Sequence, residues 1–193
     1  MLSSSSSQKG LGRFFTISAP SGTGKTTLVV RLLKEFSNLK RSISCTTRPP
    51  RPGEKEAIDY YFLNRNAFEA LLKQDSFFEH EEVHGAFYGT PKAPILQRRA
   101  EGLDTILDID TRGAQNLKKS FPDTCLIFLM PPSLEVLEER LRKRKTEAEN
   151  SLQRRLQDAR SQIAEKDKFD YVIINDDVDQ TYKKLREIIL RKK

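Results

Sequence analysis

The chain has 193 residues, of which 34 are Lys or Arg and 27 are Asp or Glu, giving a net charge of +7. This length fits a single α/β domain with small insertions and a core that needs no covalent staples. No apolar run is long enough to cross a membrane. The two cysteines, Cys45 and Cys125, form neither a metal-binding spacing nor a disulfide framework, so we expect a cytoplasmic protein.

The positive charge fits either a nucleic-acid surface or a pocket for polyanionic small molecules. Arginines occur in clusters along the chain, although any single pair can also lie on a solvated face. No nucleic-acid-binding module is recognisable, and the clusters accompany a phosphate-binding motif, which favours the second explanation. The Ser-rich start lacks the charged and apolar regions of a secretory signal, and we expect a flexible tail there.

The first motif follows an apolar run, Phe14 to Ser18, that is typical of a buried strand. A loop with two glycines comes next, and residues 28–36 have the apolar spacing of a helix. Strand, loop, Gly-Lys-Thr and helix is the arrangement of a phosphate-binding P-loop. Gly22 and Gly24 allow positive φ, so that backbone N–H groups can face an anion.

Two side chains of this loop are expected to act directly. Lys25 can reach the β- and γ-phosphates of a nucleotide, and Thr26 can offer a hydroxyl to Mg²⁺. Ala19 stands where the general motif has glycine, so it must adopt negative φ at the end of the strand. The alternative is a chance Gly/Ser/Thr-rich turn before an amphipathic helix.

Residues 41–45 are predicted to form a second strand. The segment 46–54 contains three prolines together with Arg48 and Arg51, and the prolines exclude a helix or central strand. A stiff segment with two guanidinium groups is suited to hold a phosphate, although a proline-rich surface loop is an equal alternative.

The stretch 46–90 is predicted to be a small β-rich insertion with one helix. Its expected elements are a strand at 59–63, a helix from the N-cap Asn66 (with Glu69 as capping-box partner) to Lys73, a strand at 77–83 and a Gly/aromatic turn at 85–90.

Residues 80–84 satisfy the H-E-x-x-H pattern, in which two histidines bind zinc and Glu81 acts as a general base. The chain has no third histidine, the flanking residues favour β-structure, and Gly85 would end a helix directly after the motif. Glu101 is a conceivable distant third ligand. We therefore treat a zinc site as the minor alternative.

The next helix is expected at 91–101, and the following strand, 103–110, ends in two carboxylates. Asp108 is suited to hold Mg²⁺ through water, because ligands of α/β sheets bind at the carboxyl ends of strands. Asp110 either joins this site or caps the next helix, 111–120. Alternating strands and helices then continue with a strand at 125–130, a helix from the cap Ser133 to Arg144, a strand at 171–175 and a helix at 179–190.

Residues 140–168 are strongly charged, and their few large apolar residues are too sparse to predict a core. We expect a mobile helical lid that brings Arg140, Arg144, Arg154 and Arg155 over a nucleotide, with a solvent-exposed helical hairpin as the alternative. The whole pattern indicates a parallel sheet with helices on both faces.

Taken together, the motifs resemble the guanylate kinase family of nucleoside monophosphate kinases over residues 13–192. The resemblance lies in Ala19 to Lys25, Ser44 to Glu54 with Asp59-Tyr60, Phe77 to Glu79, Tyr88 to Thr90, Ile106 to Asp110 and Val172 to Asp177. It implies an α/β P-loop kinase: a central parallel sheet flanked by helices, a β-rich GMP-binding insertion and a helical lid. The implied divisions are a tail (1–12), core (13–45), GMP-binding insertion (46–91), core (92–139), lid (140–168) and core (169–193).

The resemblance also implies roles for residues. ATP binding falls on Ala19, Pro20, Ser21, Gly22, Thr23, Gly24, Lys25, Thr26, Thr27 and Asn175. GMP binding falls on Arg48, Arg51, Tyr60 and Tyr88 for the phosphate and on Ser44, Glu79, Thr90 and Asp110 for the guanine, and it also includes Asp108. Catalysis falls on Lys25, Arg48, Arg140, Arg144 and Arg155, and Mg²⁺ binding on Thr26 and Asp108.

The implied reaction is phosphoryl transfer from ATP to GMP with Mg²⁺, in purine nucleotide metabolism and GMP recycling. The implied partners are ATP and GMP, without nucleic acid or membrane, and the implied assembly is a monomer or homodimer. Four positions depart from the family pattern: Ala57 and Lys145 for Gly, Ala86 for Asn and Arg112 for Gln. The alternatives are a non-catalytic phosphoprotein-binding scaffold and a kinase for another phosphorylated sugar or nucleotide.

Overall fold

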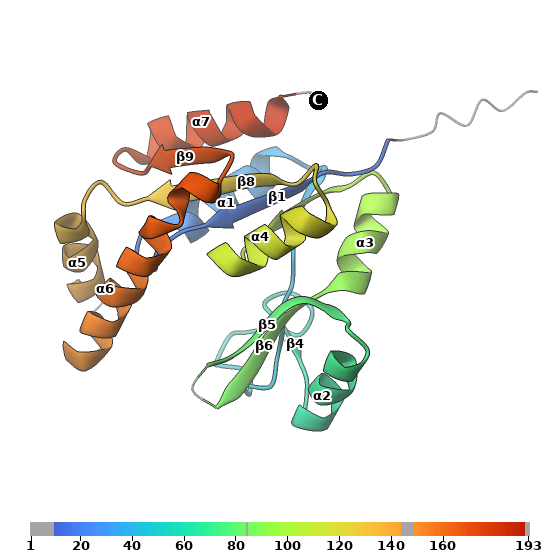
Figure 1. Cartoon of the computed structure of the whole chain (residues 1–193). Coiled ribbons are helices and arrows are strands. Elements are labelled where there is room, and N and C mark those ends of the chain that lie inside the picture. The colour runs from blue at the N-terminus through green and yellow to red at the C-terminus, as the bar shows by residue number, and fades with distance from the viewer. Residues whose placement is uncertain (1–9, 84, 144–148, 192–193) are drawn as a thin grey trace, which may run out of the picture. The chain divides into compact units, whose positions relative to one another are not determined.

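The computed structural model describes residues 10–83, 85–143 and 149–191, which Figure 1 shows as a ribbon. The chain divides into two compact units. We call residues 1–14 and 42–105 the hairpin unit, and residues 15–41 and 106–193 the P-loop unit. Among the described helices, none has the length and hydropathy needed to span a membrane.

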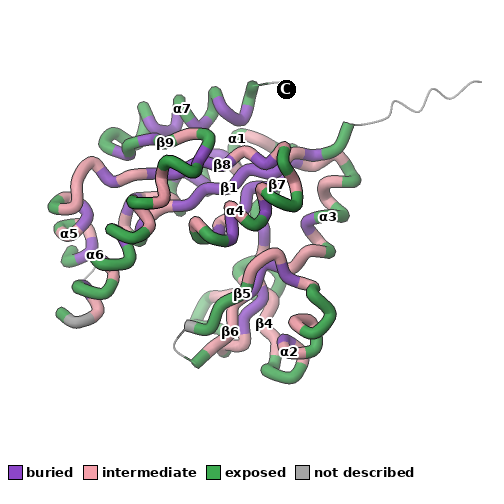
Figure 2. The backbone as a smooth tube through the Cα atoms, in the orientation of Figure 1, coloured by how far each residue is buried: buried purple, intermediate pink, exposed green. Residues whose placement is uncertain are grey.

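A five-stranded sheet has the order β2-β7-β1-β8-β9. Its strands are β1 (Phe14–Ser18), β2 (Leu39–Arg41), β7 (Asp104–Leu107), β8 (Cys125–Met130) and β9 (Tyr171–Ile174). β8 pairs in parallel with β1 on one side and with β9 on the other, as the predicted parallel sheet requires. Figure 2 shows the purple of buried residues along β1 and β8, the central strands of the sheet.

Helices cover both faces of this sheet, as predicted. On one face, α1 (Lys25–Glu35) and α7 (Val178–Leu190) share a core with alternate residues of the strands, including Ile127 and Leu129. Because neighbouring residues of a strand face opposite sides, the buried Leu126 and Phe128 lie on the other face, and α4 (Thr111–Ser120) packs against β8.

The charged stretch after residue 140 contains a core, and the prediction that its apolar residues are too sparse was wrong. Helices α5 (Leu134–Arg142) and α6 (Glu149–Ala164) pack together, and a short 3₁₀ turn (Lys166–Lys168) follows them. Their buried cluster consists of Leu137, Leu141, Leu152, Leu156 and Ala159. Each helix supplies only part of this cluster, which is why neither sequence looked apolar.

The hairpin unit contains a four-stranded sheet of order β4-β3-β6-β5. Its elements are β3 (Cys45–Thr46), β4 (Tyr61–Phe62), α2 (Arg65–Lys73), β5 (Phe77–Val83), β6 (Ala86–Pro91) and α3 (Lys92–Ala100). Its core is aromatic: the ring of Phe68 stacks on Phe77 at 4.6 Å and on Phe87 at 5.4 Å, centroid to centroid.

Three local predictions were wrong in this region. The single strand expected at 41–45 is interrupted, because β2 ends at Arg41 and β3 begins at Cys45 in a different sheet. The turn expected at 85–90 is mostly strand β6, paired antiparallel with β5. The N-cap of α2 is Asn64, whose Oδ1 accepts from Ala67 N–H at 2.8 Å, and Glu69 pairs with Arg65.

Candidate functional site

The P-loop has the predicted backbone geometry. β1 ends at Ser18, α1 begins at Lys25, and the two glycines between them adopt positive φ, 91° at Gly22 and 98° at Gly24. Ala19 is not among the described residues of positive φ, in agreement with the sequence argument. The loop therefore has the conformation that turns backbone N–H groups and the start of a helix toward an anion.

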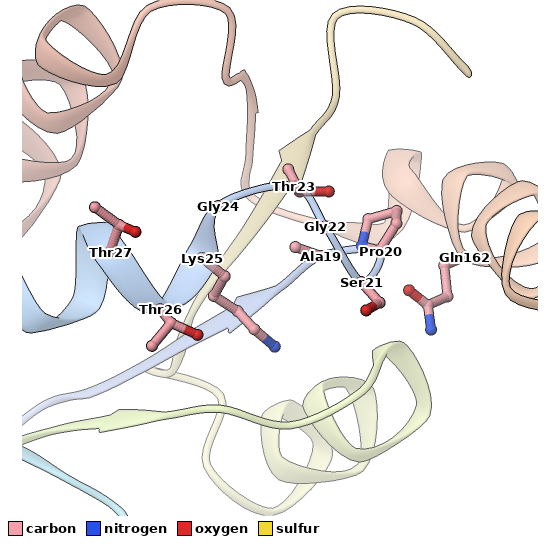
Figure 3. A pocket seen from close by; sticks show the side chains of 10 residues that line it. All are labelled: Ala19, Pro20, Ser21, Gly22, Thr23, Gly24, Lys25, Thr26, Thr27 and Gln162. Atoms are coloured by element: carbon pink, nitrogen blue, oxygen red, sulfur yellow. The ribbon is translucent and has the colours of Figure 1, made fainter. Parts of the chain in front are cut away.

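The loop encloses a cavity of about 340 Å³ lined by residues 19–27 and by Gln162 of α6. Figure 3 shows Lys25 and Thr26 extending from the start of α1, with the Gln162 amide near Ser21 and Pro20. Gln162 was not predicted. It lies two helical turns beyond Arg155, and residues seven apart share one helix face, so helical spacing from Arg155 was a signal that could have found it.

The side chain of Asn175 supports the P-loop through a hydrogen bond. The side chain is buried, with 2% of its surface exposed, and its Nδ2 donates to the carbonyl oxygen of Thr23 at 2.6 Å. A Cβ on Gly24 would approach Nδ2 to 2.8 Å, so glycine is needed there for space as well as for φ. The structure thus places Asn175 as a support of the P-loop, a contact that sequence reasoning did not identify.

Lys25 and Asp108 form an ion pair. Lys25 Nζ bonds Asp108 Oδ1, and Arg41 Nη2 lies 3.5 Å from Asp108 Oδ2. Asp110 was predicted either to join this site or to cap the next helix. Its Oδ1 accepts from Gly113 N–H at 2.6 Å, so it is the N-cap of α4.

The arginines of the predicted lid differ in placement. Arg140 lies with Nη1 and Nη2 each 3.5 Å from the carbonyl oxygen of Asn175, and Arg155 Nη1 lies 3.5 Å from Ser21 Oγ. Both guanidinium groups therefore reach the P-loop or its support. Arg144, and Lys145 after it, lie outside the described residues.

The hairpin unit gathers the predicted phosphate-binding residues. Arg48 Nη2 bonds both Glu54 oxygens, at 2.8 and 2.9 Å, and its guanidinium lies 5.5 Å from the Tyr60 ring centroid. The Tyr60 and Tyr88 rings meet edge to face at 6.1 Å. The backbone N–H of Arg51 and then the Arg48 guanidinium lower the pKa of Glu54, which therefore stays ionised beside them.

The predicted guanine-reading residues of this unit also lie together. Thr90 Oγ1 donates to Glu79 Oε1 across the paired strands β5 and β6, and Ser44 Oγ lies 3.5 Å from Thr90 Oγ1. Cys45, beside them in β3, is buried, and its burial raises the pKa of the thiol to about 11. The group presents a half-buried carboxylate that accepts from the Thr90 hydroxyl, with the Ser44 hydroxyl beside Thr90.

The zinc pattern does not take the helical form that its chemistry needs. His80 to Val83 belong to strand β5, and His84 lies outside the described residues. Among the described residues no group of His, Cys, Asp and Glu is arranged to hold a metal ion without further ligands.

A P-loop at the carboxyl edge of a parallel sheet, a lysine at the start of its helix and arginines from a helical pair define a nucleotide-binding P-loop protein. Comparison with known proteins narrows this class. The family model for guanylate kinase matches residues 12–192. The chain belongs to the guanylate kinase family.

Individual relatives agree with this assignment. A guanylate kinase of Rickettsia felis is 46% identical over 182 residues, covering 94% of this chain and 95% of that protein. A guanylate kinase of Synechococcus sp. is 45% identical over 178 residues, covering 92% of this chain and 82% of that protein. The crystal structure of guanylate kinase from Anaplasma phagocytophilum superposes with a TM-score of 0.74 and 35% identity, covering 94% of this chain and 86% of that one.

Proposed function

We propose that the protein transfers the γ-phosphoryl group of ATP to GMP, giving ADP and GDP. The observation that carries this proposal is membership of the guanylate kinase family over nearly the whole chain, with the P-loop lysine present. We further propose that it recycles GMP in the cytoplasm, as a monomer or homodimer, and acts on free nucleotides rather than on nucleic acid or at a membrane.

Glu79 is proposed to select guanine. An ionised carboxylate can accept from both N1–H and N2–H₂ of guanine, and adenine has neither donor at these positions. With AMP the carboxylate would receive neither of these two donors, which is a strong basis for rejection. Thr90 donates to the carboxylate and can orient it, and Ser44 lies 3.5 Å from the Thr90 hydroxyl.

Arg48, Arg51, Tyr60 and Tyr88 are proposed to bind the GMP phosphate. Glu54 already holds Arg48, with both carboxylate oxygens bonded to one guanidinium nitrogen. A guanidinium fixed on one side presents its remaining donors in a defined direction, which reduces the entropy lost when the phosphate binds.

The acceptor needs no general base. The second ionisation of a phosphate monoester lies near pH 6, so the GMP phosphate is mostly dianionic at neutral pH. The barrier therefore consists of positioning two polyanions in line and offsetting their repulsion. We assign this work to Lys25, the P-loop N–H groups and Arg140, Arg144 and Arg155.

Mg²⁺ is proposed as the cofactor. The Thr26 hydroxyl and the Asp108 carboxylate, the latter through water, offer the oxygen ligands that this cation prefers. When bound, the ion would neutralise charge on the β- and γ-phosphates.

The test is ADP release from Mg-ATP in the presence of GMP, of AMP and of no acceptor. We expect turnover with GMP only. Lys25→Ala should lower kcat by at least about 10²–10³-fold, the usual effect of removing a preorganised donor. Lys34→Ala, an exposed lysine on the same helix α1, is the matched control.

Glu79→Gln should lower kcat/KM for GMP by about 10- to 150-fold, because a charged hydrogen bond is lost, and should narrow the preference over AMP. Near-normal activity of Lys25→Ala would contradict the role of that lysine. Binding of GMP without any turnover would contradict the enzymatic proposal and favour a binding scaffold.

A further inference from the structure

Three neighbouring strands deliver charged side chains to one point. In the order β2-β7-β1, Arg41 is the last residue of β2, Asp108 directly follows β7, and Lys25 follows the loop after β1. All three belong to the P-loop unit. Asp108 is bonded by Lys25 on Oδ1 and approached by Arg41 on Oδ2, so one carboxylate lies between two cations.

We propose that Arg41 is a positioning residue for phosphoryl transfer, which keeps Asp108 in place when Lys25 leaves it for the nucleotide. This proposal rests on the proposed function. Sequence reasoning assigned Arg41 no role, because it treated the residue as the start of an ordinary strand.

Lys25 cannot serve two anions equally. In the structure its ammonium is paired with Asp108, yet the β- and γ-phosphates of ATP require the same group. Once Lys25 turns to the phosphates, the carboxylate loses a partner and faces Mg-ATP, whose net charge stays negative because the proposed Mg²⁺ offsets only part of the phosphate charge, and like charges repel. A second cation on the other oxygen offsets that repulsion.

Arg41 is placed to be that cation. It approaches the oxygen that Lys25 does not bond, so it can stay while Lys25 moves. Its presence also weakens the hold of Asp108 on Lys25, because a carboxylate that is shared attracts each partner less. Both effects have the same sign: loss of Arg41 should weaken ATP binding.

The expected size is modest. The Arg41 side chain is 43% exposed and that of Asp108 27% exposed, and solvent screens such pairs. We expect the KM and the dissociation constant for Mg-ATP to rise about 3- to 5-fold in Arg41→Gln, with little change in thermal stability.

Lys40→Gln is the matched control. Lys40 is the neighbour of Arg41 on β2, it is also exposed, and its replacement removes the same charge. Successive strand residues face opposite sides, so this variant reports the general loss of one positive charge. It should stay within about twofold of the wild type in every constant.

A double-mutant cycle with Asp108→Asn isolates the contact. If Arg41 acts through Asp108, then Arg41→Gln should have no further effect on Mg-ATP binding in the Asp108→Asn background. Arg41→Lys, which keeps the charge, should recover most of the lost affinity. Affinity is measured by titration calorimetry with Mg-ATP and with ATP in EDTA, so the readout does not depend on turnover.

Equal effects of Arg41→Gln and Lys40→Gln would overturn the proposal. An undiminished effect of Arg41→Gln in the Asp108→Asn background would also overturn it. Failure of the proposed function would give a distinct result, because the wild-type protein would then release no ADP in the presence of GMP. The role of Arg41 would still be decided by the calorimetric comparison of the variants.

Discussion

Replacing Asn175 by Asp tests how the P-loop is held. The Asn175 amide donates to the Thr23 carbonyl at 2.6 Å in a buried position. Aspartate has the same shape, but when ionised it places an oxygen where the donor was. Two oxygens then face each other, and the Thr23 carbonyl loses its partner. Protonated aspartic acid restores a donor, so the variant should depend on pH.

The magnitude follows from the lost bond. A buried carbonyl left without a donor costs about 1–3 kcal/mol, equivalent to about 5- to 150-fold in an equilibrium constant. We expect a loss in this range for Mg-ATP binding by Asn175→Ala. Burial and the facing carbonyl should raise the pKa of an aspartate here, while the Arg140 guanidinium, 3.5 Å from the backbone oxygen of residue 175, opposes that rise.

The sign of the pH effect is fixed by which form is competent. The protonated acid supports the loop, and its fraction grows as the pH falls, so Mg-ATP affinity of Asn175→Asp relative to wild type should improve from pH 8 toward pH 6. The Mg-ATP affinity of Asn175→Ala relative to wild type should not change with pH. Asn116→Asp, at an exposed position of α4, controls for the added charge.

Mg-ATP titrations across this pH range, each divided by the wild-type value, provide the assay. A flat ratio for Asn175→Asp that equals the ratio for Asn175→Ala would refute the donor argument. A loss below twofold in Asn175→Ala would show that the bond to Thr23 does not support nucleotide binding.

Three further outcomes are expected. Ala57 has φ of +58°, which costs an L-residue about 1–2 kcal/mol. Ala57→Gly should therefore raise the free energy of unfolding by about 0.5–1 kcal/mol, after the backbone entropy of glycine is subtracted, whereas Ala70→Gly within α2 should lower it. A lower free energy of unfolding for Ala57→Gly in denaturant titration would contradict this. Cys45, with its pKa raised to about 11, should be about one part in a thousand thiolate at pH 8 and resist alkylation in the folded protein; labelling as fast as in denaturant would be inconsistent with that. Leu156→Ala should lower the free energy of unfolding by about 2–5 kcal/mol and speed amide hydrogen exchange in α5 and α6. Leu96→Ala, at a residue that is 37% exposed, should change either quantity little.

The sequence predicted best where one local rule decides the structure. The runs at 14–18 and 125–130 match β1 and β8 residue for residue. Both are rich in apolar residues because central parallel strands are buried on both faces, and the two polar residues of the first run, Thr16 and Ser18, are buried as well. The N-caps at Ser133 and Asp110 also follow from a local rule, since a side-chain oxygen there can accept from the third residue of the helix.

Prediction failed where the deciding contacts come from elsewhere in the chain. The alternation of residues 41–45 suits a strand, but the backbone passes there from one sheet to another. Gly89 suggested a turn, yet it lies within β6. A Cβ at this position would come within 2.8 Å of the Phe77 ring and 3.1 Å of the Phe68 ring, which accounts for the glycine. That glycine serves packing, which only the folded unit reveals.

The same limit applies to α5 and α6, the helices of the predicted lid, where a core orients two adjacent arginines differently. Leu152 and Leu156 are one turn apart on α6 and face α5. Arg155 stands on the flank of that buried stripe, where it is half-buried and its guanidinium reaches Ser21, whereas Arg154 lies two residues from each leucine and is exposed. Because 100° separates successive helix residues, the leucine spacing decides which of two adjacent arginines can reach the P-loop. The apolar residues that seemed too few for a core therefore also determine which positive charge reaches the nucleotide site.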